Sequence, residues 1–163
     1  MRAIVICLAF ALPAALSVAQ QPAPEKTKTF SSAADVASLI AKSKSERKDN
    51  QPIVNQRILH LAPDNANLEY RASVGAAAVH ETEAEIFYVI DGSGTMVTGG
   101  KLVNEKRTNA ENLSGTAIEG GTSQPMAKGD FLIVPENTPH WFSSINGTLV
   151  LMTLHVPRTS AAH

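Results

Sequence analysis

The side chains best suited to chemistry in this sequence are the carboxylate of Glu85 and the imidazole of His140. Glu85 precedes an apolar run that ends at an Asp-Gly turn at positions 91–92. Because strand side chains alternate between two faces, Glu85, Phe87 and Val89 share one face. A carboxylate in line with Phe and Val requires a partner, since burying an unpaired charge is costly. Such a group can bind a metal ion or move a proton.

His140 follows a second segment whose residue types position it. A predicted strand over Phe131–Val134 is stopped by Pro135. Asn137 can then take the left-handed conformation that a tight turn needs. This turn places His140 at the start of the next predicted strand, with Phe142 on the same face.

The elements that must position these two segments are short strands. From Ile53 onward, apolar runs alternate with turn signals rich in Gly, Asn, Asp and Pro. With no second long helix and no internal repeat, this pattern predicts one all-β sandwich or barrel. The predicted strands are Ile53–Leu61, Leu68–His80, Ile86–Ile90, Gly94–Thr98, Thr116–Glu119, Phe131–Val134, Trp141–Ser144 and Leu149–Val156.

The polar stretch Lys101–Ser114 interrupts this pattern. We interpret it as a surface hairpin extension, with a lid over the barrel mouth as the alternative.

The first residues differ in character from the rest. Arg2, the apolar stretch Ala3–Leu16 and small residues before Gln20 are typical of a secretory signal peptide cleaved after Ala19. An uncleaved anchor is the alternative. The signal looks bacterial in style, so we expect a secreted protein, periplasmic or extracellular, without stable membrane insertion after cleavage.

A leader and a short helix separate this peptide from the strands. Residues 20–29 are expected to be mobile, and Ser31 or Ser32 caps a predicted helix that runs to about Lys44. The predicted organisation is therefore a signal peptide at 1–19, a leader and helix at 20–52, and a β-barrel domain at 53–158.

Composition excludes several classes of function. The formal charge is −1 and the basic residues are scattered, so no nucleic-acid partner is expected. The single cysteine, Cys7, lies within the predicted signal peptide. Disulfides, thiol catalysis and cysteine-type zinc sites are therefore excluded from the processed chain.

The second segment resembles a signature of the cupin superfamily. The pattern G-x5-P-x-G-x2-H-x3-N is matched by Gly129, Pro135 and His140. Asn137 stands where Gly is usual, and Ser144 stands where Asn is usual. The resemblance is to the single-domain, cupin type-2 conserved barrel proteins, and it implies a cupin-type jelly-roll β-barrel.

The first segment resembles the other cupin signature, H-x-H-x3–4-E-x6-G. Glu85 and Gly92 match it at the required interval. With a four-residue spacer, its second histidine is His80 and its first position holds Ala78, which cannot bind a metal. With a three-residue spacer, the two histidine positions fall on 79 and 81, which hold Val and Glu, and His80 lies outside the pocket.

The resemblance implies a divalent metal ion bound inside the barrel by His80, Glu85 and His140. Two imidazoles and one carboxylate are the set that non-haem iron oxygenases use, and the set also suits Mn²⁺, Ni²⁺, Zn²⁺ or Co²⁺. The alternative is that the metal is lost and Glu85 is a buried group hydrogen-bonded to His140. The side chains expected to line the substrate pocket are Phe87, Phe142 and Met96.

Three further side chains are weaker candidates. His60 is interpreted as an ordinary strand histidine. His155 lies on the last predicted strand, where an inward side chain could reach the pocket, although a structural role is favoured. Arg71 is expected to form a surface pair with Glu69, with binding of a substrate anion as the alternative.

Two classes of function follow from the resemblance. The first is a small metal-dependent enzyme of oxygenase, isomerase or lyase type that acts on a small organic substrate, with Glu85 as ligand or general base. The alternative is a non-catalytic cupin that binds a small molecule without metal. A homodimer is also expected, through the helix over 31–44 or the exposed face of the strand over 53–61.

Overall fold

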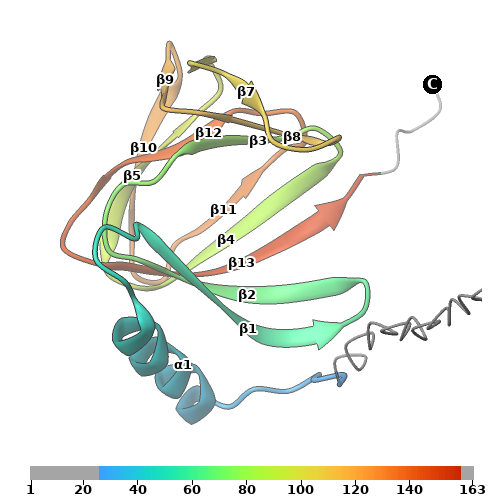
Figure 1. The fold of residues 1–163 in the computed structure, drawn as a ribbon, viewed down its shortest axis with the longest axis vertical. Coiled ribbons are helices and arrows are strands. Elements are labelled where there is room, and N and C mark those ends of the chain that lie inside the picture. Colours follow the sequence, from blue (N-terminus) through green and yellow to red (C-terminus); the bar gives the residue numbers. More distant parts are fainter. Residues whose placement is uncertain (1–25, 159–163) are drawn as a thin grey trace, which may run out of the picture.

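The computed structural model describes residues 26–158 of the 163-residue chain. The predicted signal peptide and the first part of the leader lie outside the described residues. Beyond the N-terminal helix, the described chain forms two antiparallel sheets that face each other, with a short two-stranded ribbon at the top of the view (Figure 1). This architecture confirms the expected all-β jelly-roll barrel with a short N-terminal helix. None of the helices in the described region is long and apolar enough to span a membrane.

The strands divide between the two sheets and the ribbon as follows. The five-stranded sheet has the order β1 (Ile53–Leu61), β2 (Asp64–Arg71), β13 (Leu149–Pro157), β4 (Glu83–Asp91) and β11 (Phe131–Val134). The six-stranded sheet has the order β10 (Thr122–Ala127), β5 (Ser93–Thr98), β12 (His140–Ile145), β3 (Ala77–His80), β8 (Asn112–Gly115) and β7 (Lys106–Arg107). The ribbon pairs β6 (Lys101–Val103) with β9 (Ala117–Glu119).

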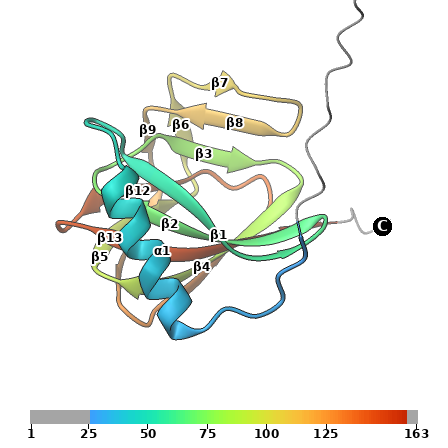
Figure 2. The ribbon, with the colours of Figure 1, turned by 60° about the horizontal axis from the view of Figure 1, so that its bottom comes forward.

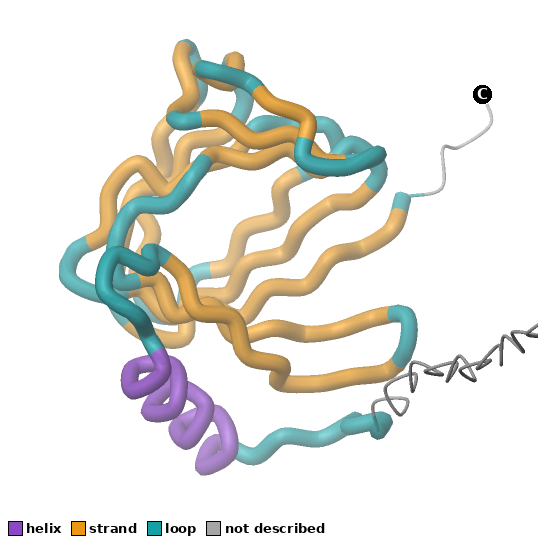
Figure 3. The backbone as a smooth tube through the Cα atoms, in the orientation of Figure 1, coloured by secondary structure: helices purple, strands orange, loops and turns teal. Residues whose placement is uncertain are grey.

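The single strand predicted over Leu68–His80 is wrong, because the chain changes sheets within it. Strand β2 ends at Arg71, a connection crosses to the opposite sheet, and β3 begins at Ala77 (Figure 3). Each piece has the alternation of a strand, so the sequence pattern alone does not mark the crossing.

The stretch Lys101–Ser114 contains three strands that sequence patterning did not predict. Strands β6, β7 and most of β8 lie in it, and β8 extends the six-stranded sheet by pairing with β3. The stretch is therefore hydrogen-bonded to the barrel wall, and one of its residues reaches the site described below.

The helix α1 (Ala33–Glu46) begins where the sequence predicted. Ser32 caps it, and the amide of Asp35 donates to the Ser32 hydroxyl while the Asp35 carboxylate accepts from the Ser32 amide. The helix lies across the outer face of the five-stranded sheet (Figure 2). Its apolar side chains pack there with strand residues in a cluster that includes Val36, Leu39, Ile40, Val54, Ile58, Leu68, Tyr70 and Val150.

The contacts of the N-terminal region bear on two expectations. Helix α1 packs against Val54 and Ile58 of β1, so the dimer contact expected for the exposed face of this strand would have to use its other side chains, and it stays a prediction. The end of the predicted mobile leader is ordered, because Lys28 and His60 exchange two backbone hydrogen bonds of 2.8 and 2.9 Å.

The inner core lies between the two sheets. It consists of Phe87, Val89, Met96, Met126, Val134, Phe142, Leu149 and Leu151. Along β4, the inward Phe87 and Val89 continue the face on which Glu85 lies, as the alternation predicted. The apolar core thus fills the middle of the barrel, and a group of polar side chains gathers at the end where β3 and β13 finish and β4 begins.

Candidate metal centre

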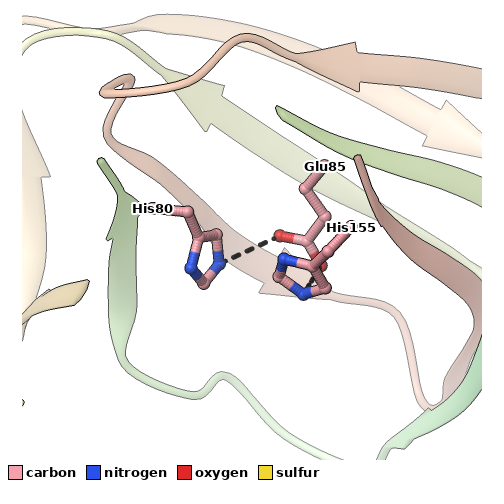
Figure 4. A group of neighbouring side chains, drawn as sticks. All are labelled: His80, Glu85 and His155. Carbon is pink, nitrogen blue, oxygen red and sulfur yellow. Dashed lines mark ion pairs between the residues drawn. The ribbon is translucent and has the colours of Figure 1, made fainter. Parts of the chain in front are cut away.

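Glu85 is buried at this end of the barrel and is surrounded by imidazoles. Its side chain points inward from β4, and the residue is only 4% exposed. Oε2 lies 3.0 Å from Nε2 of His140 and 3.3 Å from Nε2 of His80, while Oε1 lies 3.6 Å from Nε2 of His155. Figure 4 shows His80 and His155 turned toward this carboxylate. A buried carboxylate requires a polar partner, and Glu85 has three imidazoles as partners.

His140 is delivered by the turn that the sequence predicted. Asn137 has the left-handed φ of 54° expected for it. Its amide donates a 2.7 Å hydrogen bond to the carbonyl of His80, which joins the turn to the end of β3. His140 is buried, and its Nδ1 lies 3.1 Å from the carbonyl oxygen of Thr138. The two cupin-like segments are thus held together by backbone as well as by side chains.

His80 points at Glu85, as the four-residue spacer requires. Val79, beside it, is buried on the other face of β3, and Glu81 forms an ion pair with Arg107 at 2.7 Å. The Nδ1 of His80 lies 2.6 Å from Oδ1 of Asn112 on β8. Because that oxygen only accepts, Nδ1 carries the proton and Nε2 faces the carboxylate.

Sequence reasoning did not place two of the site's side chains. His155 was favoured as structural, yet its Nε2 faces Glu85, and its Nδ1 lies 3.1 Å from Oε2 of Glu83. This Nδ1 is buried and is not aligned with the Glu83 oxygen as a hydrogen bond. Asn112 was part of a stretch interpreted as a surface extension. The inward alternation of the last strand was the one signal for His155, and the sequence held no signal for Asn112.

The charges of the site are set by these contacts. Burial disfavours the ionised form of Glu85, but hydrogen bonds from His140 and His80 outweigh burial and lower the pKa of its carboxyl from 4.5 to about 2. Burial likewise disfavours the charged form of His80, yet hydrogen bonds to Glu85 and Asn112 raise the pKa of its imidazole above the usual 6.5. Glu85 is therefore ionised at neutral pH.

The donor set fits a divalent transition metal. The ligand atoms of His80, Glu85 and His155 lie within 4.8 Å of one another, and His140 contacts the same carboxylate. Imidazole nitrogen with a single carboxylate suits Zn²⁺, Fe²⁺, Mn²⁺, Ni²⁺ or Co²⁺ better than Ca²⁺ or Mg²⁺, which prefer oxygen alone.

The residues predicted to line a substrate pocket form a packed floor beneath the site. Phe87, Phe142 and Met96 are each at most 1% exposed and belong to the inner core. The ring of Phe87 lies edge-on to both His140 and Phe142, with centroid distances of 5.9 and 6.0 Å. Their contact with a substrate stays a prediction.

The other candidates lie apart from the carboxylate of Glu85. His60 bonds to Asn65 at 2.6 Å, as an ordinary strand histidine would. Arg71 does pair with Glu69, at 2.6 Å, but the expectation of a surface pair is wrong. Their side chains are only 12% and 14% exposed, and the Arg71 guanidinium lies 5.0 Å from the ring centroid of Phe142.

A cavity of about 250 Å³ adjoins the site. It lies between the tip of the β1–β2 hairpin and the end of β13, and its walls include Asn65, Asn67, Glu83 and His155. His155 thus lines this cavity and also faces the carboxylate of Glu85.

The fold and the site together define an antiparallel barrel with histidines and a carboxylate gathered inside one end. The family model described as Cupin matches residues 47–159. The chain belongs to the cupin family, as the two signatures predicted. A search of curated proteins finds no match to this sequence.

Solved structures share the fold at low sequence identity. A cupin superfamily protein from Desulfitobacterium hafniense DCB-2 is 14% identical, with a TM-score of 0.51, over 83% of this chain and 99% of the other. The KdgF protein of a Halomonas species is 17% identical, with a TM-score of 0.49, over 70% and 86%. A protein from Thermus thermophilus is 14% identical, with a TM-score of 0.49, over 71% and 93%. At these identities the likeness concerns the fold alone.

Proposed function

We propose that this protein is a metal-dependent cupin enzyme that acts on a small organic compound, with His80, Glu85 and His140 as metal ligands. The observation that carries the proposal is the position of Glu85, which is buried, ionised and faced by imidazole Nε2 atoms. A structural carboxylate would need one such partner, whereas a metal centre needs several converging donors.

The residues around such a metal centre would have different roles. A bound divalent ion would supply Lewis acidity, or one-electron chemistry with dioxygen if it is iron. Asn112 and the Thr138 carbonyl hold the rings of His80 and His140 so that each Nε2 faces inward. The packed rings of Phe87 and Phe142 keep water from the barrel side of the site.

Metal analysis of the natively purified protein tests this proposal. We expect about one equivalent of a divalent metal per chain, lost in His140→Ala while the fold is retained by far-UV circular dichroism. His60→Ala is the matched control, because His60 lies on a strand outside the site and should leave the metal content unchanged. Metal well below one equivalent, and equally low in His140→Ala, would instead support a non-catalytic small-molecule-binding cupin without metal.

We also propose that the protein is exported to the periplasm or beyond. The proposal rests on the charged, apolar and small-residue pattern of the first residues. Fractionation of a bacterial host followed by mass spectrometry should find a chain that begins at Gln20. A chain that retains Met1 and stays with the membranes would contradict cleavage after Ala19.

The homodimer expected from the family resemblance stays a prediction. The five-stranded sheet has exposed apolar side chains at both of its edges, Leu61 at the end of β1 and two residues on β11. There Phe131 is 71% exposed and Ile133 is 58% exposed.

A further inference from the structure

His155 lies outside the ligand set that the cupin signatures supply, yet it points into the same site. Its Nε2 lies 3.6 Å from Oε1 of Glu85. Its ring meets the ring of His80 edge-on, with a centroid distance of 4.5 Å and an angle of 84°. In Figure 4 the two imidazoles flank the carboxylate from different strands.

The strand register accounts for this position. Strand β13 pairs with β4, and His155 is directly opposite Glu85 in that pairing. Directly opposite residues of an antiparallel pair project to the same face at short separation. Since Glu85 faces the interior, His155 must face it as well.

Ala78 occupies the position where the first signature would place a histidine. It lies two residues before His80 on β3, so its side chain shares the face of His80. It is also the direct cross-strand partner of His140. A histidine at this position would therefore enter the site, whereas the methyl group of Ala78 offers no ligand atom. Strand β3 thus brings one imidazole to the site, not two.

The three histidines around Glu85 share one arrangement. Each turns Nε2 toward the carboxylate and has an oxygen acceptor beside Nδ1. These acceptors are Oδ1 of Asn112 for His80 at 2.6 Å, the Thr138 carbonyl for His140 at 3.1 Å, and Oε2 of Glu83 for His155 at 3.1 Å. Histidines that bind metals almost always donate their other ring N–H to such an oxygen. For His155 the oxygen lies at hydrogen-bond distance from the buried Nδ1, although the two are not aligned as a hydrogen bond.

We propose that His155 is the fourth ligand of the metal centre and replaces, from the opposite wall of the barrel, the imidazole that Ala78 does not provide. Glu83 is then a positioning residue that holds the His155 ring. This inference rests on the proposed function, because it requires that the site bind a metal.

The experiment compares the full-length processed protein with His155→Ala and with the double variant Ala78→His/His155→Ala. Zn²⁺ affinity is measured by competition with a chelator. Cu²⁺ serves as a second probe, because nitrogen hyperfine splitting in its EPR spectrum counts the coordinated imidazoles. His60→Ala is the control for loss of a histidine outside the site. His155→Gln, which keeps more side-chain volume, replaces the alanine variant if that variant does not fold.

We expect His155→Ala to lose one imidazole from the Cu²⁺ spectrum and to bind Zn²⁺ about 10- to 100-fold more weakly. The double variant should recover both properties, because position 78 faces the site. The proposal is overturned if His155→Ala keeps the wild-type spectrum and affinity while His140→Ala loses them, a result that would leave the proposed function intact. If His140→Ala and Glu85→Gln also leave Zn²⁺ affinity unchanged, the proposed function is contradicted, and this inference is contradicted with it.

Discussion

Oε2 of Glu85 lies 3.0 Å from Nε2 of His140, and this contact joins the two cupin signatures inside the barrel. Glu85 enters from β4 of one sheet and His140 from β12 of the other. The contact therefore exists only when the two sheets face each other. The stability of this end of the barrel therefore depends on the ionisation of Glu85.

Glu85→Gln should abolish tight metal binding and leave the fold in place. The amide has nearly the shape of the carboxylate but lacks its charge, so we expect metal affinity to fall by at least about 100-fold. Glu81→Gln is the matched control, because Glu81 is nearby but pairs with Arg107 outside the site. Isothermal titration of both variants checks this, and equal loss in both would contradict a specific role for Glu85.

The metal-free protein should lose stability in acid through Glu85. Because its pKa is lowered from 4.5 to about 2, its contribution is fully present above pH 4.5 and is lost as pH falls through about 2. The loss amounts to about 3 kcal/mol of unfolding free energy. Urea unfolding at a series of pH values measures it. In Glu85→Gln the unfolding free energy should fall less steeply in acid. An equally steep fall in this variant would contradict the role given to Glu85.

His80 determines how the stability of the metal-free protein changes at higher pH. Its pKa is raised above 6.5, so its contribution to the metal-free protein is full below 6.5 and is lost as pH rises through the folded value. Metal affinity should change in the other direction, since protons compete for Nε2, and should rise by about tenfold per pH unit until His80 is neutral. Titrations of the protein with Zn²⁺ across this pH range test the predicted rise in affinity. An affinity that falls with rising pH would refute the prediction.

Asn112→Ala should weaken the centre without removing a ligand. Oδ1 of Asn112 orients His80, and its own amide donates to Oδ1 of Asn109 at 3.0 Å, which fixes its orientation. We expect metal affinity to fall by about 10-fold and the pKa of His80 to decrease. Nitrogen NMR of labelled histidine reports both effects. Asn146→Ala, which loses only a bond to Ser93 elsewhere, should change neither.

The glycines of the two signatures should differ in their tolerance of alanine. Gly92 has φ of +84°, and an added Cβ would collide with the carbonyl of Thr148. Gly129 has φ of +95°, and an added Cβ would meet nothing within 4 Å. We expect Gly129→Ala to cost about 1–2 kcal/mol from backbone strain and Gly92→Ala to cost about 3 kcal/mol or more. Thermal unfolding compares them, and equal costs would refute the steric argument.

Sequence patterning located most of the strands because turn residues and alternation are local signals. Strand β1 was predicted at its observed bounds, and so was β11. Strand β10 was missed because nearly all of it is exposed and it contains Pro125, which argues against a strand by composition. The connection between β2 and β3 was not predicted because a change of sheet does not alter the alternation of polar and apolar residues.

The sequence by itself determined the family and the barrel, and it predicted that His80, Glu85 and His140 lie together, because fixed spacings within two short segments relate them. Only the tertiary structure decided which other side chains surround Glu85. His155 and Asn112 reach the site through the pairing of β13 with β4 and of β8 with β3. These pairings join residues far apart in the chain, and the free energy that selects their register comes from burying whole sheet faces. Alternation along the last strand allowed His155 to face inward, but no local pattern showed that it lies opposite Glu85 or that Asn112 lies beside His80.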